Sequence, residues 1–346
     1  MTDQLVDTVV IGGGLHGLSA ALHLARAGQR VVVLERAWSG RHASGASAAG
    51  VRTLGRDLRE MPLATRSMHM WHRIEDLVGD DCGFHAHGQL RVAATEEDLA
   101  TLAVRVGRLH DLGYDNEQMI DHDQLRALVP GIADKFIGAA YAPRDGAADP
   151  HKTLRAFRHA CAAAGVVLLE RAGVTGIRRG AGCWHVSTGA RGFAAGTIVN
   201  AAGAWGGQIA AMIGDQIPLS AKASMMIVTE RLNQTVKPVI SVMGRKLSFK
   251  QSSQGTLIIG GGVQGRYDMD REQTVLDFRA LAAGAAAATE LFPAVASVRI
   301  NRCWSGIEGK TADLVPVIGP AVNAPGVVHV FGFSGHGFQL VPAAGE

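Results

Sequence analysis

The sequence predicts an α/β fold in which a parallel, nucleotide-binding sheet shares the chain with a second domain of α+β type built on an antiparallel sheet. A β-branched run at Thr8–Ile11 is followed at once by a glycine cluster and then by a helical repeat rich in Ala and Leu over Leu18–Ala27. A second apolar run, Val31–Leu34, ends in an acidic residue. Between residues 217 and 305, short apolar runs separated by turn residues predict antiparallel strands.

The glycines between the first strand and the first helix have the spacing of a dinucleotide fingerprint, Gly12-x-Gly14-x-x-Gly17. The first makes the turn, the second lets a pyrophosphate approach the backbone, and the third lets the helix pack on the strand. The phosphates are expected at the helix N-terminus, where N–H groups and the helix dipole favour anions. Glu35, about 20 residues further on, is placed to accept hydrogen bonds from an adenosine ribose. A chance cluster among the 44 glycines would not bring all these features into register.

The length and composition indicate a folded protein of two domains, or of one domain with a large insertion. The chain has 346 residues, of which 47% are hydrophobic and 19% charged, and this excludes a disordered chain. We place the nucleotide-binding domain at residues 1–88, 138–216 and 306–346, and the substrate domain at residues 89–137 and 217–305.

Charge and cysteine usage limit the partners and the location that we expect. The net charge is only +3, and no basic block with interleaved aromatic residues appears, so we expect no nucleic acid. The four cysteines and His85, His87 and His110 lack metal-ligand spacing, so we expect no metal. No run approaches the roughly 18 apolar residues of a membrane span, and the N-terminus lacks signal-peptide features, so we expect a cytoplasmic protein.

Further segments have the periodicity of helices or strands. Helices are predicted over Pro62–Val78, over Glu96–Leu112 behind a Thr95 N-cap, and from Pro150 to Ala164. Consecutive antiparallel strands are predicted at Met225–Thr229, Val239–Val242, Leu247–Gln251 and Thr256–Gly260.

Three other stretches are candidates for contact with the dinucleotide. The loop 36–50 is dense in Ser, Gly and Ala, and its position beside Glu35 favours cofactor contact over a flexible connector. The strand within Thr197–Trp205 ends in small residues, as a cofactor wedged against a sheet requires. A second glycine turn follows the strand Val327–Phe331, where N–H groups and a helix dipole can meet a polar ring edge.

With both glycine turns and Glu35 in place, the chain resembles the FAD-dependent D-amino-acid oxidase superfamily over nearly its whole length. Val10–Leu18 and Gly332–Phe338 look most like the glycine oxidase and sarcosine oxidase branch. Trp304–Gly309, with Pro316–Pro320, is similar to the β subunits of opine oxidase and D-hydroxyproline dehydrogenase. The resemblance implies a Rossmann-like FAD-binding domain interleaved with an antiparallel-sheet substrate domain.

The same resemblance implies a flavoprotein oxidase or dehydrogenase that acts on CH–NH or CH–NH2 donors. Its substrate is an amino acid or N-substituted amino acid of the opine, sarcosine, glycine or D-hydroxyproline type, oxidised to an imine by hydride transfer to flavin N5. FAD is expected to be noncovalent, and a buried thiol is the expectation for Cys303. A second subunit or a separate electron acceptor is a further partner implied by these relatives.

The residues assigned to FAD come from the first turn, the loop after Glu35, the strand near residue 200 and the terminal glycine turn. They are Gly12, Gly14, Leu15, His16, Gly17, Glu35, Arg36, Ser44, Gly45, Ala46, Ser47, Ala49, Gly50, Val51, Val174, Ala201, Ala202, Gly203, Trp205, Gly306, Gly335, His336, Gly337, Phe338 and Gln339.

The resemblance assigns substrate contact to Arg52, His336 and Gln339. Glu308 stands where glycine oxidase and D-amino-acid oxidase have an arginine for the substrate carboxylate, and Gln339 stands where monomeric sarcosine oxidase has a lysine. Glu308 therefore favours a cationic substrate group, or is a structural carboxylate. Because an arginine pairs bidentately with a carboxylate, a cationic residue elsewhere is expected as the substitute clamp. Arg52 is the first choice, since the resemblance implies that its loop reaches the flavin. The alternatives are Arg56, Arg245, Lys246 and Lys250.

Two other functions are compatible with parts of the sequence. The first is an NAD-dependent dehydrogenase, against which the second glycine turn argues, since a nicotinamide enzyme has no need of it. The second is a non-catalytic or partner-dependent subunit of a hetero-oligomeric amine oxidase or dehydrogenase, favoured by the early end of the chain at Glu346.

Overall fold

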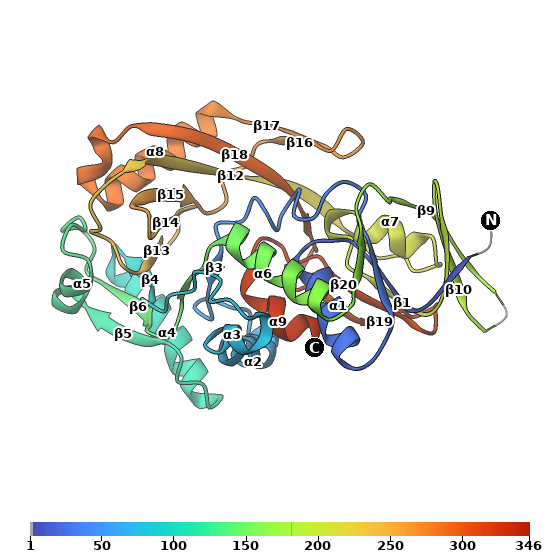
Figure 1. Ribbon diagram of the computed structural model, residues 1–346. Helices are drawn as coiled ribbons and strands as arrows, with labels where there is room; N and C mark the ends of the chain where they lie inside the picture. The colour runs from blue at the N-terminus through green and yellow to red at the C-terminus, as the bar shows by residue number, and fades with distance from the viewer. Residues whose placement is uncertain (1–2, 181) are drawn as a thin grey trace.

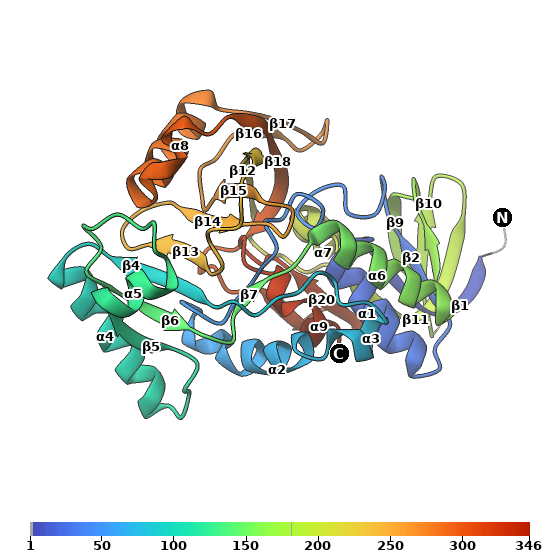
Figure 2. The same ribbon diagram turned by 60° about the vertical axis from the view of Figure 1, so that its left-hand side comes forward.

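The computed structural model describes residues 3–180 and 182–346 (Figure 1). Within these ranges the strands form two eight-stranded sheets and two small two-stranded sheets. Figures 1 and 2 both place the first large sheet at the end of the molecule that carries the N-terminus, and the second at the opposite end. This arrangement confirms the predicted α/β fold class, with an antiparallel-rich second sheet.

The first sheet has the order β19-β20-β11-β1-β2-β8, and the β9–β10 hairpin extends it from β11. The strands β11, β1, β2, β8 and β20 are mutually parallel. Parallel strands end at a common edge, so Gly12, Glu35, Ala201 and Gly332 follow their strands at the same side of the sheet. The bounds are β1 Gln4–Ile11, β2 Val31–Leu34, β8 Val167–Leu169, β9 Val174–Arg179, β10 Trp184–Thr188, β11 Gly192–Asn200, β19 Val317–Pro320 and β20 Val327–Phe331.

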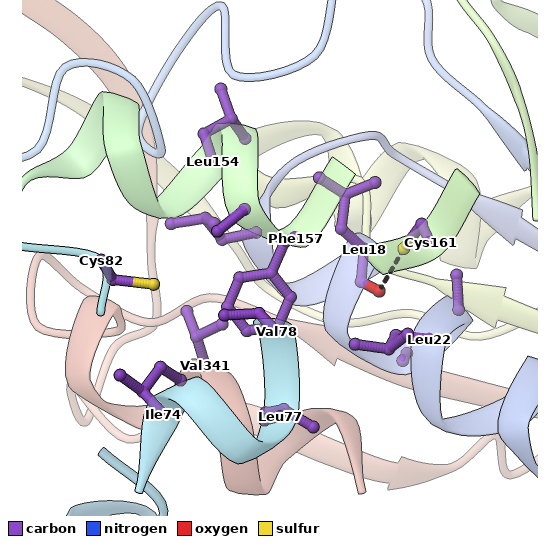
Figure 3. Close-up of a cluster of buried hydrophobic side chains, with 14 of the residues drawn as sticks. Leu18, Leu22, Ile74, Leu77, Val78, Cys82, Leu154, Phe157, Cys161 and Val341 are labelled. Atoms are coloured by element: carbon purple, nitrogen blue, oxygen red, sulfur yellow. Dashed lines mark hydrogen bonds between the residues drawn. The ribbon is translucent and has the colours of Figure 1, made fainter. Parts of the chain in front are cut away.

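Helices cover one face of this sheet and enclose a core with it. Val10 points into this core, while Val9 and Ile11 point to the opposite face, as the strand period of two requires. Figure 3 shows Phe157 of α6 surrounded by side chains of neighbouring helices, including Leu18 and Val78. The bounds are α1 Leu15–Arg26, α2 Met61–Trp71, α3 Ile74–Val78, α6 Pro150–Ala163 and α9 Val341–Gly345. The helix α7, Gly206–Ala211, packs on the opposite face through Ile209.

The second sheet has the order β18-β12-β15-β14-β13-β4-β6-β5. One face packs against α5 and α8 through a core that includes Leu90, Val92 and Ile240, and the alternate residues point to the other face. The bounds are β4 Gln89–Ala93, β5 Gln118–Asp121, β6 Gly138–Ala142, β12 Ser220–Arg231, β13 Val239–Val242, β14 Ser248–Gln251, β15 Thr256–Gly260, β18 Ile300–Lys310, α4 Glu96–Asp111, α5 His122–Leu128 and α8 Phe278–Leu291.

Short elements complete the fold. Thr95 caps α4 by accepting from Asp98 N, as predicted. The bounds are β3 Gly50–Val51, β7 Gly146–Ala147, β16 Arg266–Asp268, β17 Gln273–Val275, and the 3-10 turns Leu58–Glu60, Gly203–Trp205, Pro293–Ser297 and Phe338–Leu340.

Two sequence predictions about these elements were wrong in detail. The helix predicted over Pro62–Val78 is two helices, α2 and α3, separated at His72 and Arg73. The strand β12 does not pair with the next strand in the chain but lies between β18 and β15, while β13 pairs in parallel with β4. Both differences arise from packing partners distant in sequence, which override local periodicity.

Strand pairing bears on the domain boundaries, which stay a prediction. The strand β6 begins at residue 138 and pairs with β4 and β5 in the second sheet. The strand β18 continues across residue 305 as far as Lys310. These pairings favour moving both boundaries a few residues toward the C-terminus.

In the part of the chain that the structure describes, no helix combines the length and the apolarity that crossing a membrane demands. The same residues contain no group of three or more His, Cys, Asp and Glu side chains placed to hold a metal ion.

Truncation of Phe157 tests the packing of the helical face. The ring is fully buried between α6 and its neighbours, so Phe157→Ala should lower the free energy of unfolding by about 3–5 kcal/mol. The matched control is Phe278→Ala, because Phe278 is 75% exposed and its loss should change that free energy by less than about 0.5 kcal/mol. Urea unfolding measures both, and equal effects would contradict the described core.

Candidate functional site

A cavity of about 770 Å³ runs from the carboxyl edge of the first sheet to the inner face of the second. Its volume lies within the roughly 300–1,000 Å³ of small-molecule and cofactor sites. At one end it is lined by the first glycine turn and Glu35, and at the other by side chains of β4, β12 and β13. The two large sheets therefore each contribute one end of the site.

The turn between β1 and α1 leaves no space for side chains at two of its glycines. Gly12 has φ +112°, and a Cβ atom there would lie 2.4 Å from the carbonyl oxygen of Ala201. A Cβ atom on Gly17 would lie 1.9 Å from the carbonyl oxygen of Gly12. At the N-cap of α1, Gly14 has no side-chain cap, and the first turn has no acidic residue. The positive end of the helix dipole thus faces the cavity.

Glu35 lies beside this turn and is held by backbone amides. Its Oε2 accepts from Gly13 N and its Oε1 from Ala37 N, both at 2.8 Å. Burial raises the pKa of the carboxyl group, while these two hydrogen bonds oppose that shift. Each oxygen of a carboxylate can accept a second hydrogen bond, so Glu35 keeps acceptors for hydroxyl groups in the cavity.

A carboxylate from the second half of the chain neutralises cationic side chains near Glu35. Glu272, between β16 and β17, accepts from Arg36 Nε at 2.7 Å and lies 3.3 Å from His42 Nε2 and 3.4 Å from Arg41 Nε. The Arg36 guanidinium also lies over the Trp205 ring, 4.4 Å from its centroid. The β16–β17 hairpin thereby fixes the loop that borders this end of the cavity.

The terminal glycine turn brings His336 to the cavity with both ring nitrogens in use. Its Nδ1 accepts from Arg56 Nη1 at 2.7 Å, and its Nε2 donates to the Leu314 carbonyl oxygen at 3.1 Å. This tautomer is assigned from the partners, since an arginine can only donate. Burial and the positive charges of Arg56 and Arg52 lower the pKa of His336 to about 3. The imidazole is therefore neutral near pH 7 and is not available as a base.

Arg56 and Gln339 hold this histidine from behind the cavity wall. Arg56 is 2% exposed, and its Nη2 donates to Gln339 Oε1 at 3.0 Å. The Gln339 Nε2 in turn donates to the Ala64 carbonyl oxygen at 2.8 Å. Neither Arg56 nor Gln339 lines the cavity. The substrate contact assigned to Gln339 stays a prediction, and its described contacts are those of a positioning residue.

The far end of the cavity contains several cationic side chains. Lys222 Nζ donates to the Ser334 carbonyl oxygen at 3.0 Å and lies 3.4 Å from Glu308 Oε1, which also accepts from Ser224 Oγ. Glu308 therefore has two partners within the protein. Arg52 lines the cavity and donates from Nη1 to the Leu54 carbonyl oxygen at 2.5 Å.

The other candidate clamps are engaged elsewhere or lie outside the cavity. Arg245 lines the cavity, but its Nη1 lies 2.7 Å from Glu290 Oε2. Lys250 is buried behind the cavity, where its Nζ donates to the Ala148 carbonyl oxygen at 3.4 Å. Burial lowers the pKa of Lys250 to about 8. Neither Lys246 nor Lys250 lines the cavity, so Arg52 is the sequence candidate best placed to meet a substrate.

Most residues assigned to the cofactor line this one cavity. The exceptions, besides Gln339, are Gly17, Gly45 and Val51, which pack beneath the turn and loop that they belong to. Sequence reasoning missed Arg91 and Lys222. The alternation Gln89-Leu-Arg91-Val in β4 contained the signal for Arg91, because it places Gln89 and Arg91 on one face. Whether that face of β4 points to the cavity or to the core depends on its pairing with β13, which is distant in sequence.

Residues 7–346 match the model of a family described as FAD dependent oxidoreductase. The chain belongs to this family. It is 28% identical over 365 residues to mitochondrial dimethylglycine dehydrogenase of Rattus norvegicus, a match that covers 98% of the chain and 42% of that protein. The chain thus spans about two fifths of the length of that relative. One of the subunits of opine oxidase from Agrobacterium tumefaciens is 29% identical over 340 residues, with 95% of the chain and 89% of that protein covered.

A solved structure shares the fold of this family member. L-proline dehydrogenase from P. horikoshii superposes with a TM-score of 0.92 at 26% identity, covering 100% of the chain and 92% of that protein. The predicted superfamily and fold are thereby confirmed.

The cavity fits FAD on observations of its own residues. The turn admits only glycine at Gly12 and Gly17, as a dinucleotide turn requires, and Glu35 keeps free acceptor capacity beside it. His16 Nε2 is buried without a partner among the described residues, although its ring lines the cavity and stacks on Phe333 at 3.6 Å. A buried polar atom of this kind is consistent with a bound group that completes the site.

The neutral state of His336 makes a prediction for acid stability. The unfolded chain binds a proton on this histidine near pH 6.5, whereas the folded chain does so only near its lowered pKa of about 3. The unfolded state therefore binds more protons between these values, and the free energy of unfolding should fall as pH decreases through this window. His336→Asn should make that decrease shallower in urea unfolding at pH 7 to 4.5. The exposed His110→Asn is the control, and equal slopes in all three proteins would contradict the assignment.

Proposed function

We propose that the chain oxidises the C–N bond of an amino acid, or of an N-substituted amino acid of the opine, sarcosine, glycine or D-hydroxyproline type, to an imine. One observation carries the proposal: a single cavity joins a dinucleotide turn at one end to a cationic chamber at the other. Arg52 and Lys222 line that chamber, and they favour a substrate that bears a carboxylate.

The residues that would hold FAD divide along the cavity. Glu35 would accept from ribose hydroxyls. The backbone N–H of Gly14 would donate to the pyrophosphate, together with the hydroxyl of Ser44, which accepts from Leu15 N at 3.0 Å. When bound, FAD supplies the two-electron oxidant for hydride removal from the carbon that carries the amine. Cys303 does not line the cavity, and burial raises the pKa of its thiol, which supports noncovalent binding.

The protein's own contribution is to orient the amino acid and to exclude water. Arg52 would bind the carboxylate, so that the α-carbon lies where the reaction takes place. His336, neutral and held by Arg56 and Leu314, would present its ring to the substrate without taking a proton. The substrate amine would therefore enter the site already deprotonated. The imine would then be hydrolysed by water.

The relatives also support a narrower role. The opine oxidase relative is, by its name, one subunit of an enzyme, so this chain is a candidate for the flavin-carrying subunit of a larger assembly, with a second subunit or acceptor taking up the electrons. The cytoplasmic location expected from the sequence stays a prediction.

An anaerobic absorption titration tests the proposal. The purified chain should be yellow from a flavin, and one class among N-alkyl amino acids, opines, D-amino acids and hydroxyproline isomers should bleach that colour. Recovery of the colour in air would identify an oxidase, while recovery only with an added electron acceptor would identify a dehydrogenase. A flavin-loaded protein that none of these amines reduces would contradict the proposed reaction, and a colourless protein that takes up no FAD would contradict the cofactor as well.

A further inference from the structure

Arg91 is a cationic side chain of the cavity with no role in the site as described so far. It lies in the centre of β4, opposite Ser241 of β13 and Ala140 of β6. Its neighbours Leu90 and Val92 point into the core of the second sheet, so Arg91 points from the other face into the cavity. One strand flanks β4 on each side, which fixes the position of the Arg91 backbone.

The guanidinium of Arg91 converges with that of Arg52. A Cβ atom built on Gly55 would lie 3.1 Å from Arg91 Nη1 and 3.8 Å from Arg52 Nη1. Both nitrogens therefore lie within 4 Å of one point at the wall of the cavity, although Arg91 belongs to β4 and Arg52 to the loop after β3. Gly55 has φ +70° and no side chain, so it places no side-chain atom at that point.

No acidic residue within residues 3–180 and 182–346 neutralises this pair at close range. Arg91 has no hydrogen bond to a described acceptor and no carboxylate within 4 Å of its guanidinium, and Arg52 donates only to the Leu54 carbonyl. Glu117, whose charge acts on Arg91, is fully buried and is taken up by Arg105 at 2.8 Å and by the amide of Gly55 at 2.9 Å. Asp145, whose charge acts on Arg52, is also buried and accepts from the amides of Thr53 and Leu54, both at 2.8 Å. The other cavity cations, Lys222 and Arg245, do have carboxylate partners.

The pair is also partly removed from water, which makes its lack of a counter-ion unfavourable. Burial and the positive charge of Arg91 lower the pKa of Arg52, although the charge of Asp145 opposes that shift, and burial with the charge of Arg105 lowers the pKa of Arg91. Two desolvated like charges that face one another destabilise the protein unless an anion enters between them.

We propose that Arg52 and Arg91 bind one carboxylate of the substrate between them, and that Arg91 thereby sets the requirement for that carboxylate. This inference rests on the proposed amine oxidation and adds a specificity residue to it. One bridged carboxylate fits better than two separate ones, because both Nη1 atoms approach a single point. Each guanidinium can donate to one carboxylate oxygen.

The test uses FAD-loaded protein and two probes that cannot be oxidised, acetate and its uncharged analogue acetamide. Their dissociation constants are read from the change that binding causes in the flavin spectrum. The variants are Arg52→Gln, Arg91→Gln, the double variant and Arg91→Lys. Arg108→Gln is the matched control, because Arg108 is an exposed arginine of α4 whose substitution removes the same charge from the surface. The flavin content of each protein is measured first and reports folding.

We expect acetate to bind at least tenfold more weakly to Arg91→Gln and to Arg52→Gln than to the wild type, with acetamide and Arg108→Gln unaffected. In the double variant, the loss of acetate affinity should be smaller than the sum of the two single losses in free energy, because one ligand contacts both arginines. Arg91→Lys should not restore wild-type acetate binding, since an ammonium group lacks the planar pair of N–H donors of a guanidinium. With a reducing amino acid, Arg91→Gln should raise KM more than it lowers kcat.

Four results would overturn the inference. An acetate dissociation constant of Arg91→Gln within twofold of the wild type, with Arg52→Gln strongly weakened, would leave Arg52 as the clamp and the proposed function intact. Strictly additive losses would indicate two separate sites. A flavin-loaded wild type that does not bind acetate would show that Arg52 and Arg91 do not form a carboxylate site. A wild type that takes up no FAD would contradict the proposed function itself, and the inference with it.

Discussion

The site depends on the close approach of two backbones at the carboxyl edge of the first sheet. The turn after β1 meets the end of β11 where the Ala201 carbonyl occupies the space that a side chain on Gly12 would need. Gly17 then brings α1 against the same turn, because its missing side chain leaves room for the Gly12 carbonyl. The parallel pairing of β1 with β2 and β11 places Glu35 and Ala201 on either side of this turn. Without these contacts the helix N-terminus and the ribose carboxylate would not face one cavity.

A second constraint is the buried polar network behind the cationic chamber. Arg56 is almost fully buried, and it is stabilised by His336, Gln339 and the Arg52 carbonyl rather than by a close carboxylate. Glu60 lies 3.9 Å from Arg56, and its Oε1 has no hydrogen bond to a described residue. Burial of such groups is favourable only when their partners are held in place. The network therefore fixes the protonation state of His336 and the position of the Arg52 backbone together.

Local sequence signals predicted the nucleotide half of the site well. The strand, turn, helix and second strand of the first 35 residues are specified by neighbouring residues, and the structure has each of them, with Glu35 held by the glycine turn. The assignment of Gln339 rested on its position in the sequence of relatives and stays a prediction, while its described contacts are with Arg56 and the Ala64 carbonyl oxygen. Arg91 was missed because its direction follows from the pairing of β4 with β13, which joins segments about 150 residues apart.

The most direct test of the account is the affinity of the apoprotein for FAD in a Gly17→Ala variant. The added methyl group would collide with the Gly12 carbonyl and displace the turn, so FAD should bind at least tenfold more weakly than to the wild type. Gly176→Ala is the control, because a methyl group there meets no atom within 4 Å. Quenching of flavin fluorescence on titration measures both variants. Wild-type affinity in Gly17→Ala, with the protein folded, would show that this turn does not form the dinucleotide site.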